Sequence, residues 1–329
     1  METLEETQLC FPQLLNASCV KSKRPHFEAV LTEVLVLTIS LLTAFLNLLV
    51  IISISHFKQL HTPTNLLILS LAVSDFFMGF LLSFQIVIIN GCWFLGDLMC
   101  ALYQWGAYII SSSSVGAMVL ISVDRHVAIC DPLHYSTKIT QKRVQICLCL
   151  CWICSVVFKS LILKDNLEQP GRYNSCSGQC FFAVNHIAAV ADVTFNFFAS
   201  ITVIVVLYMR VFVVAVSQAR AMRSHIAAVT LQGSVKVTAK KSEIKAARTL
   251  GIVVLIFIIC FCPYHIISLK DHTNLLSGSS GPYIICFYHF NACLNPVIYA
   301  LFYPWFRKSV KLIVTLKILQ PGSCDTNIL

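Results

Sequence analysis

The chain contains 329 residues, of which 57% are hydrophobic and only 12% are charged, and its mean hydropathy is +0.78. A soluble domain carries about 25% charged residues, so this composition excludes an ordinary soluble globular protein. The net charge of +9 would suggest nucleic-acid binding in a soluble chain. The positions of these charges along the sequence instead indicate a membrane protein.

Seven apolar stretches are long enough to cross a membrane as helices, which takes about 20 residues. They cover residues 29–55, 64–90, 98–124, 144–163, 186–209, 249–269 and 282–303. Of the 24 Lys and Arg residues, 17 fall on the side that holds the C-terminus. By the positive-inside rule, the N-terminus is then outside and the C-terminus is cytoplasmic.

The sequence therefore predicts an all-α membrane protein, a seven-helix transmembrane bundle with a short amphipathic cytoplasmic helix. Its expected parts are an extracellular segment 1–27, a transmembrane domain 28–303 and a cytoplasmic region 304–329. In the last region, Phe306, Val310 and Ile313 recur at helical spacing among basic residues, which predicts a helix on the membrane surface.

The third span begins near Cys100 and ends at Asp124-Arg125, with no charge in between. Ala107, Ser111 and Ser114 fall on one face at helical spacing. Small and polar side chains on one face indicate an inner helix that packs against others. Close packing against other helices, without a functional role, is the alternative explanation for the serines.

Asp75 and Asp192 lie well inside apolar spans, where an acid costs several kcal/mol unless it is paired or hydrated. Asp75, in the second span, is interpreted as an internal cation site, with a protonated buried acid as the alternative. Asp192 lies in the fifth span, with Asn196 one turn below it, and is interpreted as a counter-ion for a cationic ligand. An ion pair with Lys159 or His289 is the alternative for Asp192.

Six of the 16 cysteines lie on the predicted outer side, where disulfides form: Cys10, Cys19, Cys92, Cys100, Cys176 and Cys180. Their connectivity does not follow from the sequence alone. Asn16-Ala17-Ser18 is a glycosylation sequon on the same side. The cysteine-rich fourth span, which also carries Trp152, has no histidine cluster, so its cysteines are interpreted as small packing residues.

The seventh span contains Asn295-Pro296-Val-Ile-Tyr299. Pro296 frees a backbone carbonyl inside the helix, and the neighbouring Asn295 and Tyr299 can hold water there. In the sixth span Pro263 predicts a kink. Between spans five and six lie eight basic residues and one acid, a surface suited to lipid headgroups or an acidic protein partner.

The third-span cysteine, Asp124-Arg125-His126, Trp152 and the Asn-Pro-x-x-Tyr motif together resemble rhodopsin-like G-protein-coupled receptors. The longer phrase over residues 291–308 resembles the signature of trace amine-associated receptors, with Ala292 in place of its serine. Phe261 stands where the family usually has tryptophan, and Ser200 stands where it usually has proline. The resemblance implies an olfactory-type amine receptor that raises cyclic AMP through a stimulatory G protein.

The resemblance also implies specific pairings and sites. Cys100 would pair with Cys180, and Cys176 with Cys19 or, as the alternative, Cys10, which leaves Cys92 unassigned. An internal sodium ion is the one cofactor expected, at Asp75, Ser114, Asn291 and Asn295. The residues implied in activation and G-protein coupling are Asp124, Arg125, Leu133, Tyr208, Phe261, Asn295, Pro296 and Tyr299. Cys324 is a candidate palmitoylation site.

Most aminergic receptors carry their amine counter-ion in the third helix, at the position that is Ala107 here. Asp192 would replace it, as in fish members of the trace amine family. The expected ligand pocket consists of Gln104, Tyr108, Ser111, Ser112, Asp192, Asn196, Tyr264, His265, Tyr288 and His289.

The expected location is the plasma membrane, including the cilia of olfactory neurons. A receptor for another biogenic-amine neurotransmitter, or for a non-olfactory ligand, is the alternative. A retinal-binding photoreceptor is excluded because residues 283–303 contain no lysine. The spans show no inverted repeats of the kind found in transporters, and no nucleophile or metal cluster indicates an enzyme.

Overall fold

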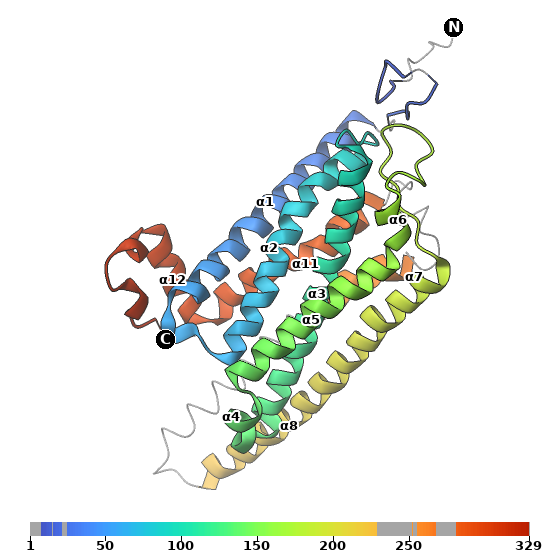
Figure 1. Cartoon of the computed structure of the whole chain (residues 1–329). Helices are drawn as coiled ribbons and strands as arrows, with labels where there is room; N and C mark the ends of the chain where they lie inside the picture. Colours follow the sequence, from blue (N-terminus) through green and yellow to red (C-terminus); the bar gives the residue numbers. More distant parts are fainter. Residues whose placement is uncertain are drawn as a thin grey trace.

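The computed structural model describes residues 8–14, 16–21, 25–228, 252, 255–267 and 281–328, and it is almost entirely helical (Figure 1). The long helices are α1 (His26–His56), α2 (Pro63–Ile89), α3 (Gly96–Cys130), α5 (Gln141–Ile162), α8 (Ser200–Ala228) and α11 (Gly281–Phe302). The shorter ones are α4 (Tyr135–Lys138), α6 (Lys164–Glu168), α7 (His186–Asp192) and α12 (Pro304–Val314). A π-helical segment, Val193–Ala199, joins α7 to α8 without a break.

The membrane spans agree with the sequence prediction wherever the chain is described. Five helices, His26–His56, Pro63–Ile89, Gly96–Cys130, Gln141–Ile162 and His186–Val214, are long and apolar enough to cross a membrane. The bent pair Tyr283–Ala300 and Pro304–Val314 brings the number to six if the pair is counted as one span. Leu255–Ile267 is a shorter apolar helix. The remainder of the predicted span 249–269 lies largely outside the described residues.

Local sequence signals explain where several helices begin. Thr62 accepts a hydrogen bond from the backbone N–H of Asn65 at 3.2 Å, and Pro63 occupies the first helical position of α2. Asn185 caps α7 in the same way through the N–H of Ile187 at 2.9 Å. At the other end of the chain, α12 begins at Pro304 and turns away from α11 by 97°, consistent with the predicted surface helix.

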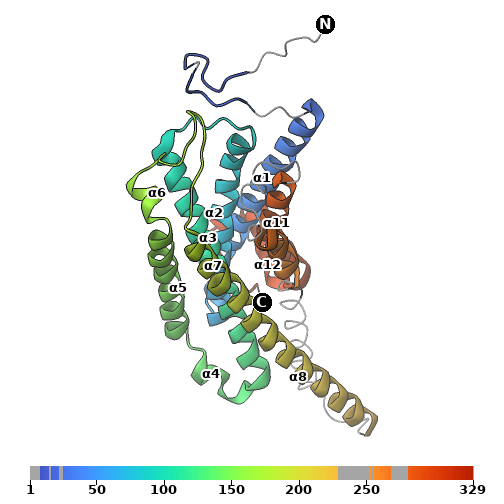
Figure 2. The same cartoon turned by 90° about the vertical axis from the view of Figure 1, so that its right-hand side faces the viewer.

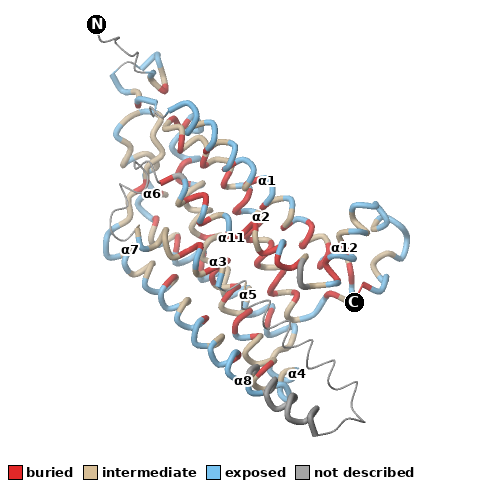
Figure 3. The backbone as a smooth tube through the Cα atoms, turned by 180° about the vertical axis from the view of Figure 1, so that it is seen from behind, coloured by how far each residue is buried: buried red, intermediate tan, exposed pale blue. Residues whose placement is uncertain are grey.

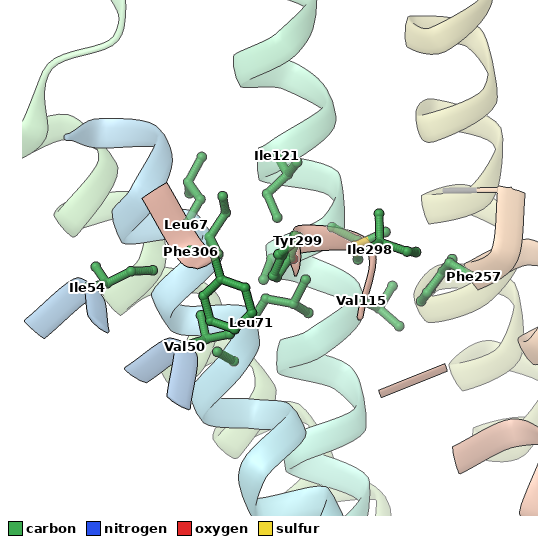
Figure 4. Packing of buried hydrophobic residues seen from close by; sticks show 14 of the residues in the cluster. Val50, Ile54, Leu67, Leu71, Val115, Ile121, Phe257, Ile298, Tyr299 and Phe306 are labelled. Carbon is green, nitrogen blue, oxygen red and sulfur yellow. The ribbon is translucent and has the colours of Figure 1, made fainter. Parts of the chain in front are cut away.

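The core lies where α1, α2, α3 and α11 pack together, whereas the outer faces of α1 and α8 are exposed (Figure 3). α5 lies on the far side of the bundle from α1, and α8 extends beyond the other helices (Figure 2). Tyr299 is 1% exposed and lies between Leu71 of α2 and Ile121 of α3 (Figure 4). Exposed apolar side chains such as Leu41 and Phe45 on α1 suit contact with lipid.

Three disulfides tie the loops together at one end of the bundle. Both expected pairs, Cys100–Cys180 and Cys19–Cys176, are present. Cys92, which the sequence left unassigned, pairs with Cys10. The N-terminal segment is therefore fastened both to the turn after α2 and to the loop before α7. We call this end of the bundle the disulfide end.

Helices α1 and α2 approach closely at Gly79. A Cβ atom there would lie 2.8 Å from the backbone nitrogen of Ala44, and Ser40 Oγ donates to the Gly79 carbonyl at 2.7 Å. Because the obstructing atom belongs to the backbone, Gly79→Ala forces the two helices apart. We expect it to lower the free energy of unfolding by about 1–3 kcal/mol, measured by thermal unfolding in detergent.

Gly106→Ala in α3 is the matched control, since the nearest atom to its Cβ would be Leu81 Cδ1 at 4.0 Å. This variant should lose no stability, because alanine is the better helix former. Equal unfolding temperatures for the two variants would contradict the close approach at Gly79.

Candidate ligand site and the polar centres of the bundle

Asp192, at the end of α7, is held by a lysine from another helix. Its Oδ1 accepts hydrogen bonds from Lys159 Nζ of α5 and, at 2.9 Å, from Asn196 Nδ2. The alternative partner, His289, instead places Nδ1 2.8 Å from the backbone carbonyl of Ile285. The structure therefore contains the ion pair that the sequence analysis gave as the alternative for Asp192, with Lys159 as the partner.

The ion pair is shielded from solvent. The Lys159 side chain is 3% exposed and that of Asp192 is 15% exposed. The Lys159 ammonium also lies 5.5 Å from the ring centre of Tyr108 and 5.7 Å from that of Phe158, both within cation–π range. A lysine this deep in an apolar bundle needs such partners, because an unpaired buried charge is costly.

Two serines extend the ion pair into a polar cluster that joins three helices. Ser112 Oγ of α3 donates to Asn196 Oδ1 at 3.0 Å, and Ser155 Oγ of α5 donates to Ser112 Oγ at 3.2 Å. We call the set Ser112, Ser155, Lys159, Asp192 and Asn196 the Asp192 cluster. Asn196 lies in the π-helical segment, a type of helix distortion that is frequent at functional sites.

A group of aromatic rings adjoins this cluster. Tyr288 of α11 shares a hydrogen bond with Ser111, and its ring centre lies 4.6 Å from that of Tyr264 and 4.4 Å from that of Phe261. His265 stacks on Phe197, a residue of the π-helical segment, with the ring centres 4.1 Å apart. We call Phe197, Phe261, Tyr264, His265 and Tyr288 the aromatic cluster.

Six of the ten predicted pocket residues belong to these two clusters, and the other four, Gln104, Tyr108, Ser111 and His289, lie beside them. Tyr108 connects to the loop before α7 through an edge-to-face contact with Phe182, with ring centres 5.5 Å apart. Gln104 and Phe182 line a cavity of about 10 Å³, room for a single water. His289 lies beside Tyr288 of the aromatic cluster, with the two ring centres 5.1 Å apart.

The sequence interpretation missed Ser155 and Phe182, and it named Lys159 only as one of two possible partners of Asp192. Ser155 and Lys159 are four residues apart, so they share one face of α5. That spacing was a readable signal that the polar face of the fourth span turns inward. Phe182 follows Cys180 by two residues, so the disulfide to Cys100 carries it to α3.

Asp75 is the centre of a second polar site, 2% exposed, in the middle of the bundle. Asn295 Nδ2 donates to its Oδ2 at 2.8 Å, and Ser114 Oγ donates to its Oδ1 at 3.4 Å. Among the described residues, the amide oxygens of Asn291 and Asn295 are buried without a hydrogen-bond partner. A carboxylate with spare oxygen acceptors fits a small hard cation, which binds oxygen ligands.

A third polar site lies at the opposite end from the disulfides, which we call the Arg125 end. Asp124, 1% exposed, accepts from both Arg125 and, at 2.8 Å, the hydroxyl of Tyr135. Arg125 Nη2 also donates to Thr64 Oγ1 of α2 at 2.6 Å. Burial raises the pKa of the Tyr135 hydroxyl, which therefore remains a donor at neutral pH. These bonds hold the side chain of Arg125, a residue of α3, between Asp124 of the same helix and Thr64 of α2.

Other residues expected to act in coupling lie around this end and along the core. The hydroxyls of Tyr208 and Tyr299 are buried without a partner among the described residues. Leu133, in contrast, is 88% exposed on the turn after α3. Phe261 stacks on Phe257 with ring centres 4.2 Å apart, and Pro296 lies inside α11.

The Lys159–Asp192 pair leads to a stability prediction. Lys159→Met or Asp192→Asn alone leaves one buried group without its partner charge, and either should cost about 3–5 kcal/mol of unfolding free energy. The double variant should cost clearly less than the sum of the two, measured by thermal unfolding in detergent.

Lys164→Met is the control for loss of a lysine, because that side chain is 63% exposed and faces Glu168 at 3.7 Å. It should be close to neutral, as surface ion pairs generally are. Strict additivity of the Lys159 and Asp192 substitutions would contradict the buried pair.

Comparison with known proteins agrees with this arrangement. The family of the 7 transmembrane receptor (rhodopsin family) matches residues 46–299. The chain is 38% identical to trace amine-associated receptor 13c of Danio rerio, over 98% of this chain and 97% of that protein. It is 34% identical to trace amine-associated receptor 4 of Mus musculus, over 98% of this chain and 96% of that protein. It is 36% identical to trace amine-associated receptor 6 of Homo sapiens, over 99% of this chain and 96% of that protein.

Proposed function

Because this chain belongs to the trace amine-associated receptors, within the rhodopsin family of seven-transmembrane receptors, we propose that it binds a protonated amine at Asp192. The observation that carries the proposal is the Asp192 cluster, in which polar side chains from α3, α5 and the fifth span are linked to Asp192, with the ring of Tyr108 beside its lysine. The third-helix position of the usual amine counter-ion is Ala107, which has no charge to offer.

The geometry leaves an oxygen for the ligand. Lys159 and Asn196 both donate to Oδ1 of Asp192, and neither of these bonds uses Oδ2. An ammonium about 4 Å from the carboxylate gains on the order of 4 kcal/mol at an effective dielectric near 20, before the costs of desolvation and of repulsion by the Lys159 ammonium. Tyr108 and Tyr264 supply aromatic faces for further cation–π attraction.

A bound ligand would act on the core through the aromatic cluster. Tyr288 contacts both Ser111 and Phe261, so a ligand beside Asp192 can shift the sixth and seventh helices against α3. Phe261 occupies the position of the family's usual tryptophan, and we assign it the same part in activation. Asp75, Ser114, Asn291 and Asn295 would hold a sodium ion that favours the resting arrangement.

At the Arg125 end, release of Arg125 from Asp124 and Thr64 would expose it to a G protein. Tyr208 and Tyr299 would then move beside it, and the exposed Leu133 would dock into the partner. We assign this partner to the stimulatory or olfactory type, with a rise in cyclic AMP as the output. The chain would lie in the plasma membrane, including olfactory cilia, with the disulfide end outside and Asn16 glycosylated there.

Asp192→Asn tests the amine site, because it removes the charge and keeps the size and hydrogen bonding of the side chain. We expect loss of cyclic-AMP responses to an amine panel by about 100-fold or more in potency, the equivalent of about 3 kcal/mol. Surface labelling verifies that the variant reaches the membrane. Unchanged potency in a surface-expressed variant would refute Asp192 as the counter-ion.

Asp124→Asn tests the lock at the Arg125 end. Loss of the carboxylate charge weakens its hold on Arg125, so basal cyclic AMP should rise several-fold. Tyr135→Phe removes a single hydrogen bond to Asp124 and should raise basal signalling less.

Arg125→Ala should bind ligand and signal weakly. Normal signalling by Arg125→Ala would remove the support for coupling through this end.

A further inference from the structure

The Asp192 cluster contains a cation of its own, which restricts the ligands it can accept. Lys159 and Asp192 are in direct contact and both are shielded from water. The charges of this pair cancel. The site is therefore a buried dipole with one positive and one negative pole, rather than a bare carboxylate awaiting a cation.

A simple monoamine fits such a site poorly. If it shares Asp192 with Lys159, two cations face one anion in a shielded space. If it displaces Lys159, the lysine loses its counter-ion, and Tyr108 and Phe158 offer it only cation–π contacts. Both arrangements leave an uncompensated buried charge, which proteins avoid.

A ligand with an ammonium and an acidic group adds no net charge. Its ammonium can pair with Oδ2 of Asp192 while its carboxylate pairs with Lys159, so that the four charges alternate in sign. Because Lys159 and Asp192 touch, the two charges of the ligand must also be adjacent, as they are in an α-amino acid. The nearby rings of Tyr108 and Phe182 favour an apolar or aromatic remainder.

We propose that the ligand class of this receptor is the zwitterionic amine, an α-amino acid or a close analogue, held by its ammonium on Asp192 and by its acid on Lys159. This proposal rests on the proposed function, since it uses Asp192 as the ammonium site. It adds Lys159 as a second recognition residue that determines specificity.

Matched ligand pairs test the proposal on the full-length receptor in cells. The pairs are phenylalanine with phenethylamine and leucine with isopentylamine, which differ only in the carboxylate. Phenylalanine methyl ester keeps the ammonium and the bulk but removes the acidic charge. The parent receptor should respond to each amino acid at about tenfold lower concentration than to its amine or ester, since an uncompensated buried charge costs at least that factor.

Lys159→Met should invert this preference, because it leaves Asp192 as a bare carboxylate suited to an ammonium and repulsive to a carboxylate. Lys159→Arg keeps the charge and should retain the preference for amino acids. It tests the role of the charge even if Lys159→Met fails to reach the cell surface. Lys164→Met, which removes an exposed lysine, should behave like the parent.

The outcomes separate the two proposals. Equal or stronger parent responses to the amines, an absence of parent responses to all the amino acids, or a preference that Lys159→Met leaves unmoved would each overturn the zwitterion assignment. If Asp192→Asn then still abolished amine responses, amine binding at Asp192 would stand. Full responses in surface-expressed Asp192→Asn would refute both.

Discussion

The need to compensate charge inside an apolar bundle determines how this structure is organised. The carboxylates of Asp75, Asp124 and Asp192 lie within it, and each is bonded by side chains from a different helix or by a neighbouring basic residue. Asp192 is bound by Lys159, Asp75 by Asn295 and Ser114, and Asp124 by Arg125 and Tyr135. Since these contacts join helices that are far apart in sequence, any shift between helices changes the pairing of a buried charge. That property allows a small ligand to influence a distant surface.

The three sites are connected through packed side chains. Ser111 and Ser112, adjacent on α3, contact different groups: Ser111 reaches Tyr288 of α11, and Ser112 reaches Asn196 of the fifth span. Ser114 of the same helix reaches Asp75, which Asn295 of α11 also contacts. One turn beyond Asn295, Tyr299 is packed among Leu71 and Ile121 (Figure 4). Helix α3 therefore touches every polar centre, and interiors packed in this way transmit displacements rather than absorbing them.

The fold could be predicted from the sequence because membrane spans obey strong constraints on length, charge and backbone hydrogen bonding. The family motifs added Cys100–Cys180 and Cys19–Cys176, and the structure contains both. Cys10–Cys92 could not be deduced, since it depends on how the N-terminal segment folds over the turn after α2. The partner of Asp192 was narrowed to two residues but not chosen. That choice depends on the rotation of α5 about its axis, which the four-residue spacing of Ser155 and Lys159 indicates only if the two are considered together.

The proposed counter-ion of this chain lies in the fifth span instead of the third helix, and this placement has a physical consequence for ligand recognition. A receptor with its acid in the third helix and no lysine opposite presents a single negative pole. Here Ala107 leaves α3 uncharged, and the acid in the fifth span faces a lysine in the fourth. The pair stabilises the resting bundle, since it joins α5 to the end of α7 beside the π-helical segment. A ligand that pairs with Oδ2 of Asp192 therefore meets the charge of Lys159 as well. We infer that a ligand with charges of both signs compensates both residues, whereas a lone ammonium leaves one charge uncompensated in the apolar interior.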